Sequence, residues 1–150
     1  MQHFLLSAAA RTLTLKQVFR MGDDAAYQTF CQLRWPETEG EAVCPRCGCV
    51  ETYNITSRRR FKCVGCHHQF SVTSGTIFHS RKLSVRDHLL AIAIFVNAAK
   101  GVSALQLGRD LDVSYKTAFV LAHKLREAMA ADQAAHQPAG EVEIDGAYFG

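Results

Sequence analysis

The chain has 150 residues, of which 48% are hydrophobic, with 17 Lys and Arg residues against 14 Asp and Glu residues. This length suits one medium domain or a few small modules, and the composition excludes wholesale disorder. No apolar run approaches the roughly 20 residues that a membrane-spanning helix needs. The net charge is 0 over residues 1–40, +5 over 41–82, +2 over 83–130 and −4 over 131–150. A basic middle followed by an acidic end predicts a polyanionic partner for the middle only.

Residues 4–10 combine phenylalanine, two leucines and small residues, which resembles the core of a secretory signal peptide. Such a core follows a basic segment, and only His3 precedes this one, so we expect no secretion. A chain that stays in the reducing cytoplasm keeps its cysteines as thiols or metal ligands rather than as disulfides.

The segment 13–40 is predicted to form short N-terminal helices. One covers residues 15–19, and a second begins near Asp23 or Asp24, either of which can cap it. The second helix should end at Trp35, because the residue before a proline avoids the helical region.

Four of the six cysteines form two pairs that are separated by fifteen residues. Two residues between the thiols of each pair let one tight turn aim both sulfurs at a metal ion about 2.3 Å away. Four thiolates close a tetrahedron and leave no position for water or substrate, so the spacing predicts a structural zinc ribbon over residues 41–78. Two disulfides or a redox-active pair are the alternatives. The predicted zinc ligands are Cys44, Cys47, Cys63 and Cys66.

Several neighbours of the ligands need their own interpretation. We expect Gly48 and Gly65 at the two turns, where the backbone must bend close to the sulfurs. Cys49 is left out of the ligand set, because using it would lengthen the first loop to four residues. The histidine pair at 67–68 is interpreted as ribbon surface, and Cys31 as a small core residue on a helix.

Alternating apolar residues predict strands at 53–56 and 61–63, on either side of a basic turn. Adjacent arginines at a hairpin tip are often only solvated side chains. With further basic residues close by, we favour contact with phosphates. The side chains expected to make these contacts are Arg58, Arg59, Arg60, Lys62, Arg81 and Lys82.

The segment 83–130 is predicted to be helical. Ser84 and Asp87 resemble a capping box that opens an apolar helix, which runs to about residue 99 and stops at Gly101. The segment 131–140 is rich in small and polar residues and is interpreted as a linker.

Within this segment, residues 103–128 predict a helix-turn-helix. Ser103 and Ser114 can each cap a helix, the turn between the two is very short, and Gly108 allows the helices to approach closely. An ordinary helical hairpin has the same apolar pattern and stays open as an alternative. In a helix-turn-helix the start of the second helix enters the major groove. The residues expected to contact DNA there are Ser114, Tyr115, Lys116, Thr117 and Lys124.

From about residue 13 to residue 150, the chain resembles the front half of bacterial insertion-sequence transposases that have an N-terminal transposase zinc ribbon. In that family a helix-turn-helix follows the ribbon, and a DDE catalytic domain of RNase H-like fold follows next, so the resemblance implies its first strand at 141–150. Two residues, Cys49 and Asp112, depart from the expected pattern. The segments that carry the resemblance are 35–36, 44–48, 63–66, 69–71, 75–78, 102–107 and 113–118.

The resemblance implies that Asp145 is the first carboxylate of the catalytic Asp-Asp-Glu set. On its own residues, an aspartate before Gly146 is equally an ordinary turn acid. Catalysis of this type needs several carboxylates to hold two Mg²⁺ or Mn²⁺ ions, and the sequence given stops at Gly150. We therefore expect a piece of a transposase that does not cut DNA by itself.

Taken together, these patterns predict a mixed, mainly α fold with a small β zinc ribbon, followed by the start of an α/β RNase H-like domain. The resemblance implies a bacterial cytoplasmic protein whose partner is the double-stranded DNA of an element's terminal repeats. It also implies self-association during transposition, and neither a membrane nor a small-molecule substrate. A stand-alone transcriptional regulator and a zinc-ribbon module that binds protein remain as alternatives.

Overall fold

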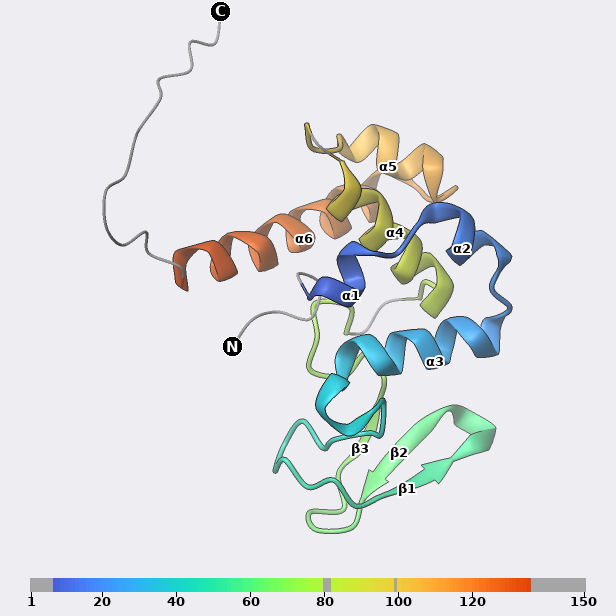
Figure 1. Ribbon diagram of the computed structural model, residues 1–150, viewed down its shortest axis with the longest axis vertical. Coiled ribbons are helices and arrows are strands. Elements are labelled where there is room, and N and C mark those ends of the chain that lie inside the picture. The colour runs from blue at the N-terminus through green and yellow to red at the C-terminus, as the bar shows by residue number, and fades with distance from the viewer. Residues whose placement is uncertain (1–6, 80–81, 99, 136–150) are drawn as a thin grey trace, which may run out of the picture.

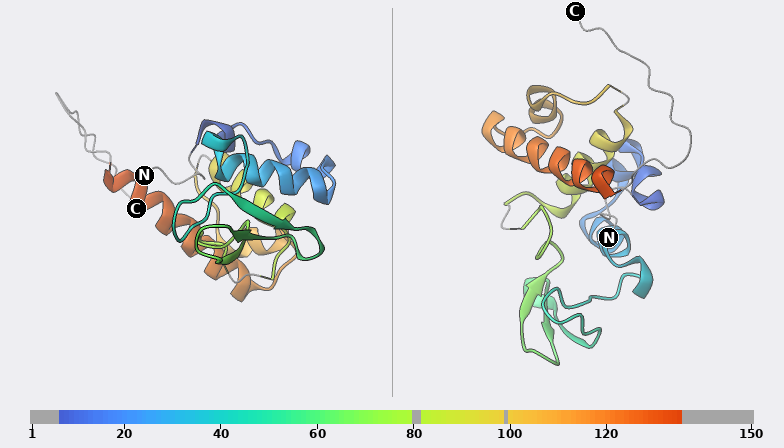
Figure 2. Two further views of the ribbon diagram at one scale, coloured as in Figure 1. Left: turned by 90° about the horizontal axis from the view of Figure 1, so that it is seen from below. Right: turned by 90° about the vertical axis from the view of Figure 1, so that its left-hand side faces the viewer.

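The computed structural model describes residues 7–79, 82–98 and 100–135, and these residues form a mainly helical chain with one small sheet. The sheet lies at one end, α5 and α6 lie at the other, and α3 and α4 lie between them (Figure 1). The views in Figure 2 show the same arrangement. The mixed, mainly α fold class is therefore confirmed. The elements are α1 (Ala8–Arg11), α2 (Leu15–Arg20), α3 (Asp23–Arg34), the short 3-10 helix η2 (Pro36–Thr38), β1 (Thr52–Ile55), the 3-10 helix η3 (Thr56–Arg58), β2 (Arg60–Cys63), β3 (Gln69–Ser71), α4 (Val85–Asn97), α5 (Ala104–Asp110) and α6 (Tyr115–Ala135).

The helices α2 and α3 begin at the predicted residues, but the cap of α3 differs from the prediction. A capping box opens α2, in which the Thr14 side chain accepts from the Gln17 backbone N–H and the Gln17 side chain accepts from the Thr14 N–H. The N-cap of α3 is Gly22, which has no side-chain cap, so the prediction that Asp23 or Asp24 caps this helix was wrong. Both carboxylates lie in the first turn of α3, where they interact favourably with the positive end of the helix dipole.

The ribbon sheet is antiparallel, in the order β1-β2-β3. Thr52 pairs with Cys63, and Phe61 pairs with Phe70 on the strand that the sequence did not predict, β3. Trp35, directly after α3, packs edge-on against both phenylalanine rings, with centroid distances of 5.9 and 6.5 Å. The small core of the ribbon therefore includes a side chain from the helical part.

Arg34, the last residue of α3, ties that helix to the segment after β3. Its guanidinium donates to the carbonyl oxygens of Ser71 (3.2 Å), Val72 and Ser74, and it lies 4.5 Å from the centroid of the Trp35 ring. Burial lowers the pKa of Arg34 to about 10, which leaves the side chain charged at neutral pH. Three backbone carbonyls of the ribbon thus depend on one cation from the neighbouring helix.

The central helix α4 packs against α1, α2 and α3. It opens with the predicted capping box, in which Ser84 and Asp87 each accept from the backbone N–H of the other, at 3.1 and 3.2 Å. It ends at Asn97, two residues before the predicted end. The Asn97 amide donates to the carbonyls of Leu13 (2.9 Å) and Ala93 (2.8 Å), so this end of α4 is bonded to the turn before α2.

The helices α5 and α6 pack closely across a short turn. A Cβ atom added at Gly108 would lie 3.3 Å from the Cβ of Ala118 and 3.3 Å from the carbonyl oxygen of Val113. Asp112 adopts a left-handed conformation in the turn, with φ of 52°. The close approach of the two helices therefore favours glycine at position 108.

The second of these helices, α6, is longer than predicted. Ser114 accepts from the Thr117 backbone N–H (3.3 Å), as an N-cap does, and α6 continues to Ala135. Residues 131–135, expected in a linker, are therefore helical, while the strand predicted at 141–150 and its Asp145 lie outside the described residues. At 21 residues α6 is long, but neither it nor any other described helix is apolar enough to cross a membrane.

We expect the substitution Arg34→Ala to lower the free energy of unfolding by about 2–4 kcal/mol, because it leaves three partly buried carbonyls without their charged donor. Urea unfolding at neutral pH, followed by circular dichroism, measures this loss. Arg20→Ala, at an exposed arginine on α2, is the matched control and should change little. Equal unfolding midpoints for the two variants would contradict the role given to Arg34.

Candidate metal centre and nucleic-acid interface

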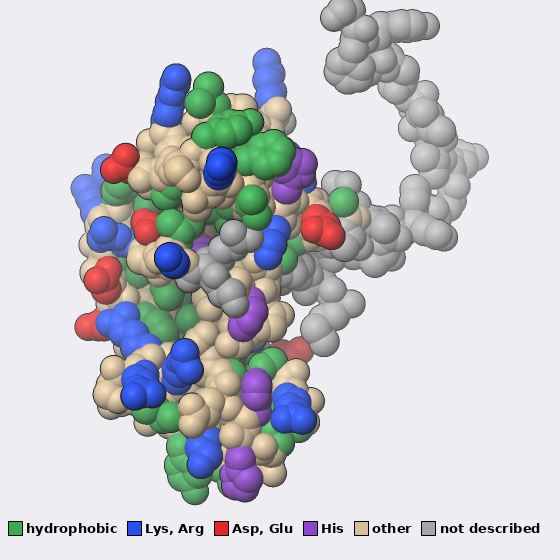
Figure 3. Space-filling view, turned by 180° about the vertical axis from the view of Figure 1, so that it is seen from behind, with side chains coloured by type: hydrophobic (Ala, Val, Ile, Leu, Met, Phe, Trp, Pro, Cys, Tyr) green, Lys and Arg blue, Asp and Glu red, His purple; other side chains and the backbone are tan. Residues whose placement is uncertain are grey.

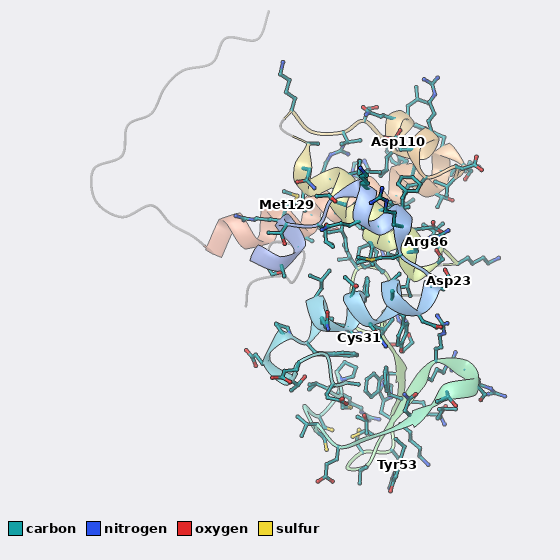
Figure 4. The ribbon with its side chains drawn as sticks, turned by 45° about the vertical axis from the view of Figure 1, so that its right-hand side comes forward. Asp23, Cys31, Tyr53, Arg86, Asp110 and Met129 are labelled. Atoms are coloured by element: carbon teal, nitrogen blue, oxygen red, sulfur yellow. The ribbon has the colours of Figure 1, made fainter. Side chains whose placement is uncertain are left out.

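The four cysteines predicted as zinc ligands lie together. Their sulfur atoms all lie within 4.8 Å of one another, with 3.6 Å between Cys44 and Cys66 and 3.5 Å between Cys47 and Cys63. Tetrahedral zinc with bonds of about 2.3 Å requires sulfur atoms about 3.8 Å apart, so the cluster has the size of a zinc site. Sulfur atoms gather beside the sheet in Figure 4. The donor set and the geometry both fit a closed, structural Zn²⁺ site.

Two loops of the same geometry present the sulfurs. In the first, Gly48 has φ of 73° and donates its N–H to the Cys44 carbonyl (2.9 Å). In the second, His67 has φ of 58° and donates to the Cys63 carbonyl (3.1 Å). The expectation for Gly48 is confirmed, but Gly65 does not adopt a left-handed conformation, and His67 occupies that position instead. Among the described residues the metal-binding cluster contains cysteines alone, so neither histidine at 67–68 joins it.

The backbone of the second loop also acts on a ligand directly. The Cys66 N–H points at the sulfur of Cys63 at 3.5 Å, and this donor is the main cause that lowers the pKa of the Cys63 thiol to about 6. A thiol with this pKa is largely ionised at neutral pH, which is the form that binds metal.

The two remaining cysteines lie outside the cluster. The Cys49 thiol lies 3.7 Å from the carbonyl oxygen of Glu51, just beyond the first loop. Cys31 is buried on α3, as expected, and burial raises the pKa of its thiol to about 11. Cys31 therefore stays protonated and packs as a small apolar side chain.

The three arginines of the β1–β2 hairpin have different surroundings. All three are exposed, but the Arg59 guanidinium also forms an ion pair with Asp24 (2.7 Å) and lies 5.4 Å from the ring centroid of Tyr27. Arg59 also has φ of 47°, in the left-handed region, at the turn before β2. Sequence patterns could not reveal that one of the three arginines is paired with α3.

The other basic residues expected to contact DNA are dispersed. Lys62 is half-buried on β2 and Lys82 is exposed, while Arg81 lies outside the described residues. Lys124, on α6, donates to the Ile77 carbonyl at 3.4 Å and so links this helix to the end of the ribbon segment. Its ammonium therefore already has a partner within the chain.

The start of α6 presents polar side chains to solvent. Tyr115 is 56% exposed, Lys116 is exposed, and the hydroxyl groups of Ser114 and Thr117 lie 3.0 Å apart. The structure thus brings together, on one helix end, four of the five residues predicted to contact DNA on this helix.

Purified protein should hold one zinc ion, and Cys63→Ser should lose both the metal and the ordered ribbon, because three thiolates do not close the site. Elemental analysis and circular dichroism measure the two effects. Cys49→Ser is the matched control, and it should keep one zinc ion. A wild-type chain that stays equally folded in excess chelator, with no metal detected, would exclude a zinc-dependent ribbon.

Comparison with known proteins gives two matches. Residues 21–69, which contain all four clustered cysteines, match the family described as the transposase zinc-ribbon domain. The chain is also 29% identical, over 126 residues, to the "Uncharacterized protein in transposable element ISH50" of Halobacterium salinarum. That match covers 82% of this chain and 40% of the relative, so the chain spans less than half of the relative's length. No solved structure matches the chain.

The family match and the structure agree on the same residues. The matched region ends within β3 and begins just before α3, so it includes the helix whose Arg34 and Trp35 complete the ribbon. The sulfur cluster supplies the chemistry that the family description names. Residues 21–69 are therefore similar to a transposase zinc-ribbon domain, and the chain as a whole is similar to a protein of a transposable element.

Proposed function

We propose that this chain is a DNA-recognition part of an insertion-sequence transposase and that it binds the terminal repeats of its element as double-stranded DNA. The observation that carries the proposal is the presence of two exposed surfaces suited to DNA on one mainly helical chain. One is the basic hairpin, defined as Arg58, Arg60 and Lys62, and the other is the exposed start of α6. Figure 3 shows the molecule from behind the view of Figure 1, and Lys and Arg side chains are spread over this face from the α5–α6 end to the ribbon end. This distribution supports the proposal.

The basic hairpin contacts phosphates. Arg58 and Arg60 are exposed near the tip of a two-stranded ribbon, and neither has an ion pair with a described residue. Arg59 pairs with Asp24 on α3, so its guanidinium is less available to a phosphate than those of Arg58 and Arg60. Phosphate contacts of this kind position a protein on DNA without reading its sequence.

The helices α5 and α6 read the DNA sequence as a helix-turn-helix. Their short turn and close packing at Gly108 support this assignment, as does the exposed N-terminal end of α6. In this motif the second helix lies in the major groove and its first residues contact base edges. Tyr115, Lys116 and Thr117 lie at this end of α6, where they can contact base edges or phosphates.

The proposal extends to the catalytic site, the self-association, the location and the role of zinc. The resemblance assigns Asp145 to a DDE site that uses Mg²⁺ or Mn²⁺, and assigns self-association to the transposition complex. A cytoplasmic location suits a protein that acts on DNA. Zinc has a structural role in the ribbon and takes no part in the strand transfer.

Replacing Arg58 and Arg60 together with Ala should weaken binding to every DNA sequence. The slope of log affinity against log salt concentration should flatten by about 2, because each phosphate contact contributes about one to that slope. Fluorescence anisotropy with a labelled duplex, over a salt series, measures it.

Two single variants serve as controls for this measurement. Arg59→Ala should change the slope by less than about one, since its guanidinium already faces the Asp24 carboxylate. Arg20→Ala, on α2, should change affinity and slope less than the double variant does. An unchanged slope in the Arg58 and Arg60 double variant would make the hairpin a solvated surface and would favour a protein partner.

A polypeptide of residues 1–150 should bind DNA but not cleave it with Mg²⁺ or Mn²⁺, because one predicted carboxylate cannot hold two metal ions. Nicking of a labelled terminal-repeat duplex is the measurement. Asp145→Asn should leave DNA binding by this polypeptide unchanged, and in a chain extended through the whole catalytic domain it should abolish nicking. Nicking by residues 1–150 that disappears on this substitution would contradict the prediction.

A further inference from the structure

A strip of exposed aromatic and aliphatic side chains runs along the first turns of α6. The ring centroids of Tyr115 and Phe119 lie 5.8 Å apart, and those of Phe119 and His123 lie 4.4 Å apart. Tyr115 is 56%, Phe119 43% and Val120 40% exposed. Leu105 on α5 is another exposed large hydrophobic residue, so half of the eight such residues in the described chain lie on these two helices.

The helical repeat explains why these residues share a face. Side chains three and four positions apart lie on the same side of an α-helix. The opposite side of α6 holds the buried residues Ala118, Leu121 and Leu125, which pack into the core. The strip, defined here as Tyr115, Phe119, Val120 and His123, therefore points away from the protein. Exposed apolar side chains that adjoin one another in this way are suited to contact with a partner.

The charges around the strip indicate its partner. Lys116 is the one charged residue among residues 115–120, and no acidic residue follows on α6 before Glu127, while the exposed Asp110 and Asp112 lie before the helix. The N-terminal end of α6 adds the positive end of its dipole. Figure 3 shows hydrophobic side chains gathered at the α5–α6 end, with a histidine and basic side chains beside them. An apolar strip with positive charge at its start complements a polyanion that carries apolar groups.

The major groove of DNA has this chemistry. Its edges are lined by phosphates, and the C5-methyl group of thymine is the apolar group that base pairs present there. We propose that Phe119 and Val120 bind thymine methyl groups in the major groove, with Tyr115 supporting the Phe119 ring and Lys116 contacting a phosphate. This inference rests on the proposed DNA-binding function and names the base that the surface reads.

The test compares thymine with uracil, which lacks the methyl group. A duplex is selected from a random-sequence pool by the zinc-loaded chain, and then synthesised again with deoxyuridine in place of every thymidine. The affinity should fall about fourfold for each methyl group lost from the contact. Phe119→Ala should lower the affinity for the thymine duplex but not for the uracil duplex, so that the ratio of the two affinities approaches one.

Matched variants separate this effect from a loss of structure. Phe19→Ala removes a phenylalanine that is 64% exposed on α2, and it should leave the ratio unchanged. Val120→Thr replaces a methyl with a hydroxyl on an exposed side chain. It should bring the ratio of the thymine-duplex affinity to the uracil-duplex affinity closer to one, even if Phe119→Ala fails to fold. Lys116→Gln should lower the affinity for the thymine duplex and the affinity for the uracil duplex by the same factor.

The outcomes distinguish the two proposals. If the chain binds no duplex at all, the proposed DNA-binding function fails. Binding with equal affinity for the thymine and uracil duplexes, or a selected sequence without thymine, overturns the thymine contact while DNA binding stands. If sedimentation shows a dimer that Phe119→Ala dissociates, the strip is a self-association surface and the thymine contact is again overturned.

Discussion

The convergence of four sulfur atoms is the constraint on which the rest of the ribbon depends. Two strands of four residues and one of three do not make a stable sheet in water, and few large apolar side chains support them. A structural zinc ion contributes roughly 10–16 kcal/mol of apparent binding free energy, which exceeds the stability of most small domains. The metal therefore determines whether the β1–β2 hairpin, and the arginines near its tip, have a fixed position.

The ribbon is nevertheless not independent of the helices. Trp35 lies against Phe61 and Phe70, and Arg34 holds three carbonyls of the segment after β3, so the end of α3 forms one side of the ribbon core. This arrangement explains why the matched family region begins at residue 21, well before the first cysteine. The same helix carries Asp24, the partner of Arg59, so α3 also contacts the tip of the hairpin.

Local signals in the sequence predicted most of the fold and the metal ligands. The cysteine spacing gave the sulfur cluster, and hydroxyl caps at Ser84, Ser103 and Ser114 located three helix starts, because each signal acts within four residues. The residues that escaped prediction depend on distant partners or on unusual backbone conformations. Arg59 and Asp24 are 35 positions apart, and His67 replaces the glycine expected in a left-handed turn. Such features are decided by tertiary packing, which periodicity does not report.

The positions of the two proposed DNA surfaces have a mechanical consequence. Figure 4 places Tyr53 of the ribbon and Asp110 of α5 at opposite ends of the molecule, so the hairpin and the α6 strip lie near different ends.

Helix α4 packs against α1, α2 and α3, and it meets α6 where the Arg126 guanidinium lies 5.7 Å from the Phe95 ring centroid. The hydrogen bond from Lys124 to the Ile77 carbonyl also joins α6 to the end of the ribbon segment. Residues this far apart, with no shared partners, usually contribute additively to binding free energy. The ribbon can therefore supply salt-dependent affinity for any DNA while α6 supplies discrimination between sequences. A change at one surface then alters one of these properties without the other.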